Sequence, residues 1–331
     1  METHDTVPDP LSSHHSARHA AKVSVVGAGS VGSTLAYTLL LRGVAPTVAL
    51  YDINKAKVEA EVLDIGHGIE FMPMSAVIGS DDISVCADSD VIAVTAGAKQ
   101  RPGQSRLELA GATIGLMKEL VPQLLEVAPD AVYVMVTNPV DVVTFAALQI
   151  SGLPAQQLFG SGTVLDSSRL RYLISLQTGV AVQNVHAYMV GEHGDTEFPL
   201  WSSASIASIP LLEWSASGGK GLTTADRDAI AREVVDSAYL VIEGKGATNY
   251  AVALAGARII EAVLRGENRV LPVSSRVEDY IGIHDVCISV PSIVGSPGVV
   301  QALQVPMNTA ETLRLHACAE AIRRVSGQFG F

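Results

Sequence analysis

The sequence has 331 residues, of which 48% are hydrophobic and 17% are charged, and its formal net charge is −12. This length allows a large core and favours two lobes over one, and the composition is that of a globular chain rather than a disordered one. The acidic balance argues against nucleic acid as the main partner, because such a partner requires a basic face. Small anions remain possible ligands, since a few arginines can dominate a local field.

The three cysteines, Cys86, Cys287 and Cys318, form neither a CxxC pair nor a cluster with metal-ligand spacing. We therefore expect buried, reduced thiols in a reducing compartment, and no metal site. Residues 1–20 are polar and lack the apolar core of a secretory signal, so they are predicted to form a mobile tail.

The stretch 23–41 carries no charge and is long enough to imitate a membrane helix. Three glycines, Gly27, Gly29 and Gly32, interrupt its first half. A strand, a tight turn and a helix explain the stretch better, so no membrane segment is expected.

Apolar runs and helical stretches alternate along the chain up to about residue 151. Strands are predicted over 22–27, 47–51, 76–79, 90–95 and 131–136, and helices over 31–41, 58–67, 114–127 and 139–150. This alternation implies right-handed crossovers, so the fold class is α/β with a Rossmann-type doubly wound parallel sheet over residues 21–151. Beyond it, helical stretches mix with short β-like runs such as 185–189 and 286–290. This pattern predicts an α+β substrate domain over residues 152–331.

A glycine-rich motif, GAGSVG, ends the first predicted strand and opens the next helix. Gly27 permits the tight turn, Gly29 lets the backbone approach a pyrophosphate, and Gly32 allows the helix to pack on the strand. Asp52 ends the following strand, where it can accept hydrogen bonds from ribose hydroxyls and repel the extra phosphate of NADP. The motif therefore predicts an NAD site; the alternative is a structural turn beside a surface aspartate.

Four further segments have the residue types of a catalytic site. They are AGAKQRPGQSR at 96–106, VTNP at 136–139, DSSR at 166–169 and GEHGD at 191–195. The first is a loop after a strand, where α/β sheets place their ligands. The spacing of three puts Asp166 and Arg169 on one helix face. Taken singly, these could be a surface ion pair, a helix cap or a structural histidine.

Together with GAGSVG, these segments resemble the L-lactate and malate dehydrogenase family from Lys22 onward. The resemblance implies hydride transfer between NADH and a 2-oxo acid, with His193 as the general acid, suited by a pKa near working pH. Asp166 should orient His193 and raise its pKa, and Arg169 should grip the substrate carboxylate. Arg106 should polarise the carbonyl, and Asn138 should donate a hydrogen bond near the reacting oxygen. The resemblance also places cofactor contacts on Val31, Lys57, Gly97, Ala98, Val136, Asn138 and Ser161.

The substrate branches of this family differ by one carboxylate. The deciding loop position falls on Gln100, where malate enzymes usually carry arginine; a neutral side chain there favours pyruvate, because a second carboxylate would be left unpaired. Arg101 and Lys99 flank it, so a register slip of one residue would reverse the interpretation. Thr248 falls where lactate enzymes have a small residue near the substrate methyl group.

Arg171 and His186 match a pair that binds fructose 1,6-bisphosphate at a subunit interface in many bacterial members. The resemblance thus implies activation by this effector, a homotetramer, and a cytoplasmic role in fermentative glycolysis. The alternatives are a solvated arginine and a strand histidine. For the whole chain, the alternatives are a malate dehydrogenase, a dehydrogenase for a bulkier 2-hydroxy acid, and an NAD-binding sensor without catalysis.

Overall fold

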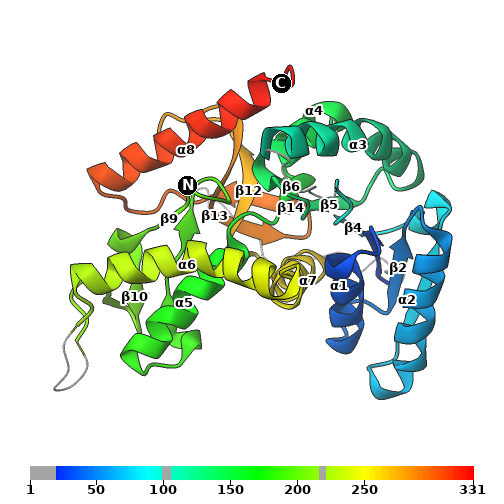
Figure 1. Ribbon diagram of the computed structural model, residues 1–331, viewed down its shortest axis with the longest axis horizontal. Helices are drawn as coiled ribbons and strands as arrows, with labels where there is room; N and C mark the ends of the chain where they lie inside the picture. Colours follow the sequence, from blue (N-terminus) through cyan, green and yellow to red (C-terminus); the bar gives the residue numbers. More distant parts are fainter. Residues whose placement is uncertain (1–19, 99–105, 216–220) are drawn as a thin grey trace, which may run out of the picture.

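The computed structural model describes residues 20–98, 106–215 and 221–331. Its centre is a nine-stranded sheet in the order β14-β13-β12-β6-β5-β4-β1-β2-β3 (Figure 1). The strands of this sheet are β1 (Lys22–Val26), β2 (Thr47–Tyr51), β3 (Ala76–Ser80), β4 (Val91–Val94), β5 (Val132–Met135), β6 (Leu158–Gly160), β12 (Arg269–Val277), β13 (Val286–Gly295) and β14 (Gly298–Ala302).

Helices connect and cover these strands. They are α1 (Ser30–Leu41), α2 (Lys55–His67), α3 (Arg106–Val127), α4 (Val140–Ser151), α5 (Val164–Thr178), α6 (Thr224–Lys245), α7 (Tyr250–Arg265) and α8 (Thr309–Gly327). Two small sheets complete the second half, β7 (Val185–His186) with β10 (Ser205–Ile206) and β11 (Ile209–Pro210), and β8 (Met189–Val190) with β9 (Phe198–Pro199). Four 3₁₀ turns lie at Ile69–Phe71, Ile83–Cys86, Val182–Asn184 and Trp201–Ser203.

The parallel part of the sheet is apolar on both faces because helices cover both. In β4, Val91 and Ala93 join a core that contains side chains of α1 and α7, whereas Ile92 and Val94 join a core with α3 and α4. Successive side chains of a strand point to opposite faces, so one continuous apolar run serves two cores. Figure 1 shows α3 and α4 on the side of the sheet opposite to α1. The predicted doubly wound sheet is confirmed.

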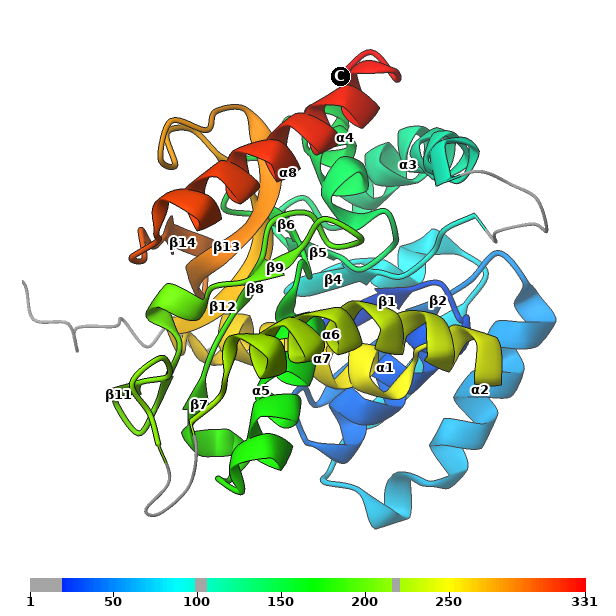
Figure 2. The ribbon, with the colours of Figure 1, turned by 60° about the vertical axis from the view of Figure 1, so that its left-hand side comes forward.

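β6 joins the parallel strands to the antiparallel ones. Met135 of β5 pairs in parallel with Gly160, and Gly160 pairs in antiparallel fashion with Ser274 of β12. The two halves of the chain therefore share one sheet. α7 contacts both α1 and α5, which ties the helices of the two halves together (Figure 2).

Three local predictions were wrong in detail. The run 185–189 is not one strand: β7 pairs with β10, and β8 pairs with β9 in another sheet. The helix predicted from residue 114 begins earlier, at Arg106. The sequence analysis missed its first part because the glycines at 111 and 115 lower the helix propensity of this stretch. Pro139 is the N-cap of α4 rather than part of its first turn.

The charge-free stretch 23–41 divides into β1, the glycine turn and the twelve-residue α1. Over the described residues, no helix combines the length and the apolar character that crossing a membrane requires.

Candidate active site

The glycine turn between β1 and α1 has the geometry of a dinucleotide site. Gly27 has a φ of +102°, which a side chain rarely adopts, and a Cβ on Gly32 would lie 1.8 Å from the Gly27 carbonyl oxygen. A Cβ on Gly29 would meet nothing within 4 Å. The turn is thus tightly packed at Gly32 and has open space at Gly29. A pyrophosphate needs this open space to approach the N-terminus of α1 closely.

Asp52 lies beside this turn, directly after β2. Its Oδ2 accepts a hydrogen bond of 2.7 Å from the backbone N–H of Ala28, and its Oδ1 accepts one of 2.9 Å from the N–H of Asn54. The carboxylate is therefore held beside the turn. Val31 lies in the first turn of α1, and Lys57 lies in the first turn of α2.

The remaining predicted cofactor residues follow the carboxyl ends of neighbouring parallel strands. Gly97 and Ala98 come after β4, Val136 and Asn138 after β5, and Ser161 after β6. Ligands of doubly wound folds bind along this edge. The residues present fit NAD, because a tight turn has open space at Gly29 and an acidic side chain, Asp52, lies beside that turn.

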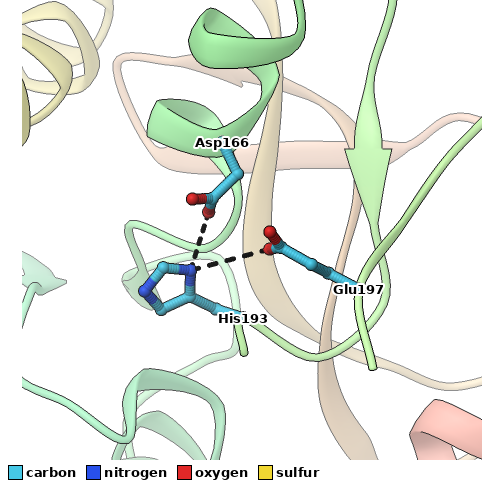
Figure 3. Close-up of side chains that lie close together, drawn as sticks. All are labelled: Asp166, His193 and Glu197. Carbon is cyan, nitrogen blue, oxygen red and sulfur yellow. Dashed lines mark hydrogen bonds and ion pairs between the residues drawn. The ribbon is translucent and has the colours of Figure 1, made fainter. Parts of the chain in front are cut away.

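His193, Asp166 and Arg169 lie together. Figure 3 shows the contact between His193 and Asp166, which the sequence predicted. The Nδ1 of His193 is 2.7 Å from Oδ2 of Asp166, and Nη1 of Arg169 donates a hydrogen bond of 2.5 Å to Oδ1 of the same carboxylate. Asp166 is almost fully buried in the first turn of α5, while the imidazole is 24% exposed. Because Nδ1 faces Asp166, Nε2 points away from it and can meet a substrate.

The loop of His193 is fixed by its backbone. The His193 N–H donates a hydrogen bond of 2.7 Å to Oδ2 of Asp141, whose Oδ1 accepts one of 2.5 Å from the hydroxyl of Ser274. Gly191, with a φ of +100°, exchanges two backbone hydrogen bonds with Ser289 of β13. The buried Asp141 therefore links α4, β12 and the histidine loop.

The electrostatics of the cluster favour a protonated imidazole. Burial alone would lower the pKa of His193, but the charge of Asp166 and its hydrogen bond are the main opposing effects, and the pKa is raised to about 9. Burial acts to raise the pKa of Asp166, yet His193 and Arg169 outweigh it and lower this pKa. Burial also raises the pKa of Asp141 to about 6.

The other predicted substrate residues are placed less completely. Gln100, with Lys99 and Arg101, lies outside the described residues, and for Arg106 only the backbone at the start of α3 is described. Thr248 lies between α6 and α7, and its hydroxyl is buried without a hydrogen-bond partner among the described residues.

Two buried carboxylates near His193 were missed by the sequence analysis. Asp141 belongs to the segment VTNPVD, and Glu197 lies four residues after His193. Among the described residues, Asp166, His193 and Glu197 are the group whose donor atoms all lie within 4.8 Å of one another, an arrangement that also suits a metal ion. Positive charge is already present beside these carboxylates. Arg169 forms an ion pair with Asp166, and the raised pKa of His193 favours its protonated form.

Arg171 and His186 line one pocket of about 620 Å³, formed by α5, α7 and β12 on a different face of α5. The Nε of Arg171 donates a hydrogen bond of 2.9 Å to the carbonyl of Ala187, and its guanidinium lies over the Tyr188 ring. No carboxylate within the described ranges forms an ion pair with Arg171, and His186 is exposed. The sequence-predicted pair is thus brought together.

Comparison with known proteins agrees with this site. The chain matches the model of the lactate/malate dehydrogenase NAD binding domain over residues 21–160, and that of the family's alpha/beta C-terminal domain over residues 163–326. The L-lactate dehydrogenase of Bifidobacterium animalis subsp. lactis (strain AD011) is 53% identical over 311 residues, which are 94% of this chain and 97% of that protein. The L-lactate dehydrogenase of Thermoanaerobacter sp. (strain X514) is 45% identical over 305 residues, which are 92% and 97% of the two chains.

Solved structures give the same result. A lactate dehydrogenase from a Medee basin deep-sea metagenome library superposes with a TM-score of 0.91 at 34% identity, covering 95% of this chain and 100% of that chain. The minor L-lactate dehydrogenase of Enterococcus mundtii superposes with a TM-score of 0.90, also at 34% identity, over 93% and 98% of the two chains. The chain therefore belongs to the lactate/malate dehydrogenase family and is an NAD-dependent oxidoreductase.

Proposed function

We propose that this protein is an L-lactate dehydrogenase that reduces pyruvate to L-lactate, with His193 as the proton donor. The observation that carries the proposal is the cluster of His193, Asp166 and Arg169. It offers a protonated imidazole, a carboxylate that holds the imidazole, and a cation for the substrate carboxylate within one helix turn and one loop. The relatives named L-lactate dehydrogenase support the choice of substrate.

Each group in the cluster has one task in the reaction. When held at the glycine turn by Gly27, Gly29 and Asp52, NADH would supply the hydride. Nε2 of His193 gives its proton to the oxygen that becomes the hydroxyl, and Asp166 stabilises the imidazolium before that transfer. Arg169 donates one N–H to Asp166, and its remaining N–H groups can donate to the substrate carboxylate. We assign polarisation of the carbonyl to Arg106 and a further hydrogen bond to Asn138.

Substrate choice rests on Gln100 and Thr248. A glutamine leaves the second carboxylate of oxaloacetate without a cation, and the small Thr248 leaves room for a methyl group. The test follows NADH absorbance with each acid. We expect a higher kcat/KM for pyruvate, and in Gln100→Arg a shift of the ratio toward oxaloacetate of about tenfold or more. Preference of the wild type for oxaloacetate would make the protein a malate dehydrogenase instead.

We also assign the pocket of Arg171 and His186 to fructose 1,6-bisphosphate, acting as an activator of a homotetramer. A guanidinium without a carboxylate partner among the described residues, at the wall of a pocket of about 620 Å³, is suited to a phosphate group. α5 connects this pocket to the cluster: Leu165 and Ser168 line the pocket, whereas Asp166 contacts His193 and Arg169 contacts Asp166. The bisphosphate would bridge cations of two subunits that otherwise repel.

The proposed reaction would regenerate NAD in the cytoplasm during fermentation. The three cysteines are free and buried, which suits a reducing compartment.

A further inference from the structure

Glu197 is a buried acid that the reaction described above does not use. It lies one residue before β9, with only 5% of its surface exposed. Its Oε2 is 3.9 Å from Nδ1 of His193, on the same side of the ring as Asp166 (Figure 3). As a carboxylate, this oxygen has no hydrogen-bond donor within reach in the described part of the chain. A buried carboxylate oxygen without a donor disfavours the ionised form of Glu197.

Glu197 and Asp166 each have a carboxylate oxygen within 4.8 Å of the other. Two carboxylates at this separation cannot both ionise easily in a buried site. Asp166 is held as the anion by the guanidinium of Arg169 and by His193. Glu197 has no such ion pair with an arginine or lysine among the described residues. Burial, and then the charge of Asp166, raise the pKa of Glu197 to about 9. Once protonated, Glu197 becomes a hydrogen-bond donor, and the adjacent carboxylate of Asp166 is its acceptor.

We propose that Glu197 is protonated at neutral pH and acts as a positioning residue, donating a hydrogen bond to Asp166 and thereby limiting how strongly Asp166 holds the His193 proton. A donor to an anion spreads its charge and lowers its basicity. The His193–Asp166 bond then holds the imidazole without trapping the proton that His193 must release. The inference rests on the proposed function for its consequence, but not for the protonation state itself.

The charge of the whole cluster agrees with a neutral Glu197. Three groups are in direct contact, the protonated His193, the anionic Asp166 and the cationic Arg169, and together they carry one positive charge. An ionised Glu197 would place a second negative charge beside Asp166 and weaken binding of an anionic substrate. The charged groups that face this site are Asp166 and Arg169 from α5, His193 from the loop, and Asp141 from α4; from α8, Arg314 lies over the ring of the neighbouring Phe198.

The first test measures protonation directly by infrared spectroscopy of the full-length protein at neutral pH. A protonated carboxyl group absorbs apart from carboxylates, and we expect its band in the wild type and its loss in Glu197→Gln. Glu192→Gln is the matched control, because Glu192 lies in the same loop and its Oε2 accepts a hydrogen bond from Thr196; this variant should keep the band. A wild type without a band that depends on Glu197 would overturn the proposal.

The second test measures the pKa of the His193 imidazole by NMR titration in two variants. Glutamine is a neutral donor of nearly the same shape, so Glu197→Gln should leave the pKa of His193 almost unchanged. Glu197→Leu removes the donor, so Asp166 should become more basic and the pKa of His193 should rise. If Glu197 were ionised, both variants would remove a negative charge and lower this pKa by about one unit or more.

A fall in the imidazole pKa of Glu197→Gln therefore contradicts the proposal, even if the leucine variant fails to fold. Neither test depends on turnover. An enzyme that kept its activity after loss of His193 would refute the proposed catalytic role and leave the protonation state of Glu197 to be judged by the infrared band alone.

Discussion

At the residue scale, Asp166 sets the charge state of His193. Pyruvate reduction needs the protonated imidazole, so kcat/KM should fall as pH rises through the pKa of about 9. Asp166→Asn removes the charge that holds this proton, so the fall should begin at a lower pH, and the rate at neutral pH should drop. The measurement is the pH profile of kcat/KM for pyruvate. Asp285→Asn, which loses only a surface ion pair with Arg276, is the control and should keep the wild-type profile. An alkaline limb unchanged in Asp166→Asn would contradict the assignment.

Asp52 should set the cofactor preference. Asp52→Ala removes the acceptor for the Ala28 N–H and the charge that repels a 2′-phosphate. We expect weaker NADH binding and a smaller preference for NADH over NADPH. Titration of both cofactors gives the two dissociation constants; an unchanged ratio would show that Asp52 does not face the ribose.

The sequence predicted well the residues that belong to recognisable sequence motifs, DSSR at 166–169 and GEHGD at 191–195. His193 and Asp166 meet as expected, and the pKa of His193 rises in the expected direction. Asp141 and Glu197 were not predicted, because a buried carboxylate shows its partners only after packing. Asp141 is 133 residues from Ser274 along the chain, and no local pattern indicates that contact.

At the scale of elements, two glycines of the turn have different roles, Gly32 in folding and Gly29 in cofactor binding. A methyl group on Gly32 would collide with the carbonyl of Gly27, whereas one on Gly29 would point into open space. Gly32→Ala should therefore lower the Tm of the cofactor-free protein. Gly29→Ala should keep the Tm but weaken NADH binding, because the methyl group blocks the approach of the pyrophosphate. Thermal unfolding and NADH titration of both variants check this. A wild-type Tm for Gly32→Ala, or wild-type affinity for Gly29→Ala, would refute this account of the turn.

The parallel strands were predictable because each is a short apolar run between helical stretches. The second half was harder. β7, β8 and β9 have two residues each, too few for a periodic pattern. β7 pairs with the later β10, whereas β8 pairs with β9 in another sheet. β6 has three residues and pairs with strands from both halves, so its place could not be read from local sequence.

At the scale of the whole molecule, the proposed effector pocket and assembly can be tested together. Fructose 1,6-bisphosphate should lower the apparent KM for pyruvate and shift sedimentation toward the larger oligomer, because a ligand favours the state that binds it more tightly. The effect should be strongest at low protein concentration and should weaken with salt. Replacing Arg171 and His186 together by glutamine should remove activation and keep basal turnover.

For this pocket, Arg232→Gln is a control, since Arg232 lies on α6 and does not line the pocket. Saturation curves and sedimentation profiles of the wild type that are identical with and without the bisphosphate would refute the effector site. Exposed apolar side chains on α6 and α7, such as Leu240, Ile242 and Leu254, are consistent with burial between subunits. The resemblance indicated Arg171 and His186 but not the other residues of the pocket, because α5, β7, α7 and β12 meet only in the fold.

The central claim is that His193 donates the proton to pyruvate, and His193→Asn tests it most directly. Asparagine keeps a polar side chain but cannot act as the acid. The measurement compares kcat/KM for pyruvate in the variant and the wild type, with the NADH dissociation constant measured on the same samples. We predict a loss of about 100- to 10,000-fold in kcat/KM with nearly unchanged NADH binding. Turnover of His193→Asn at the wild-type rate would contradict the account.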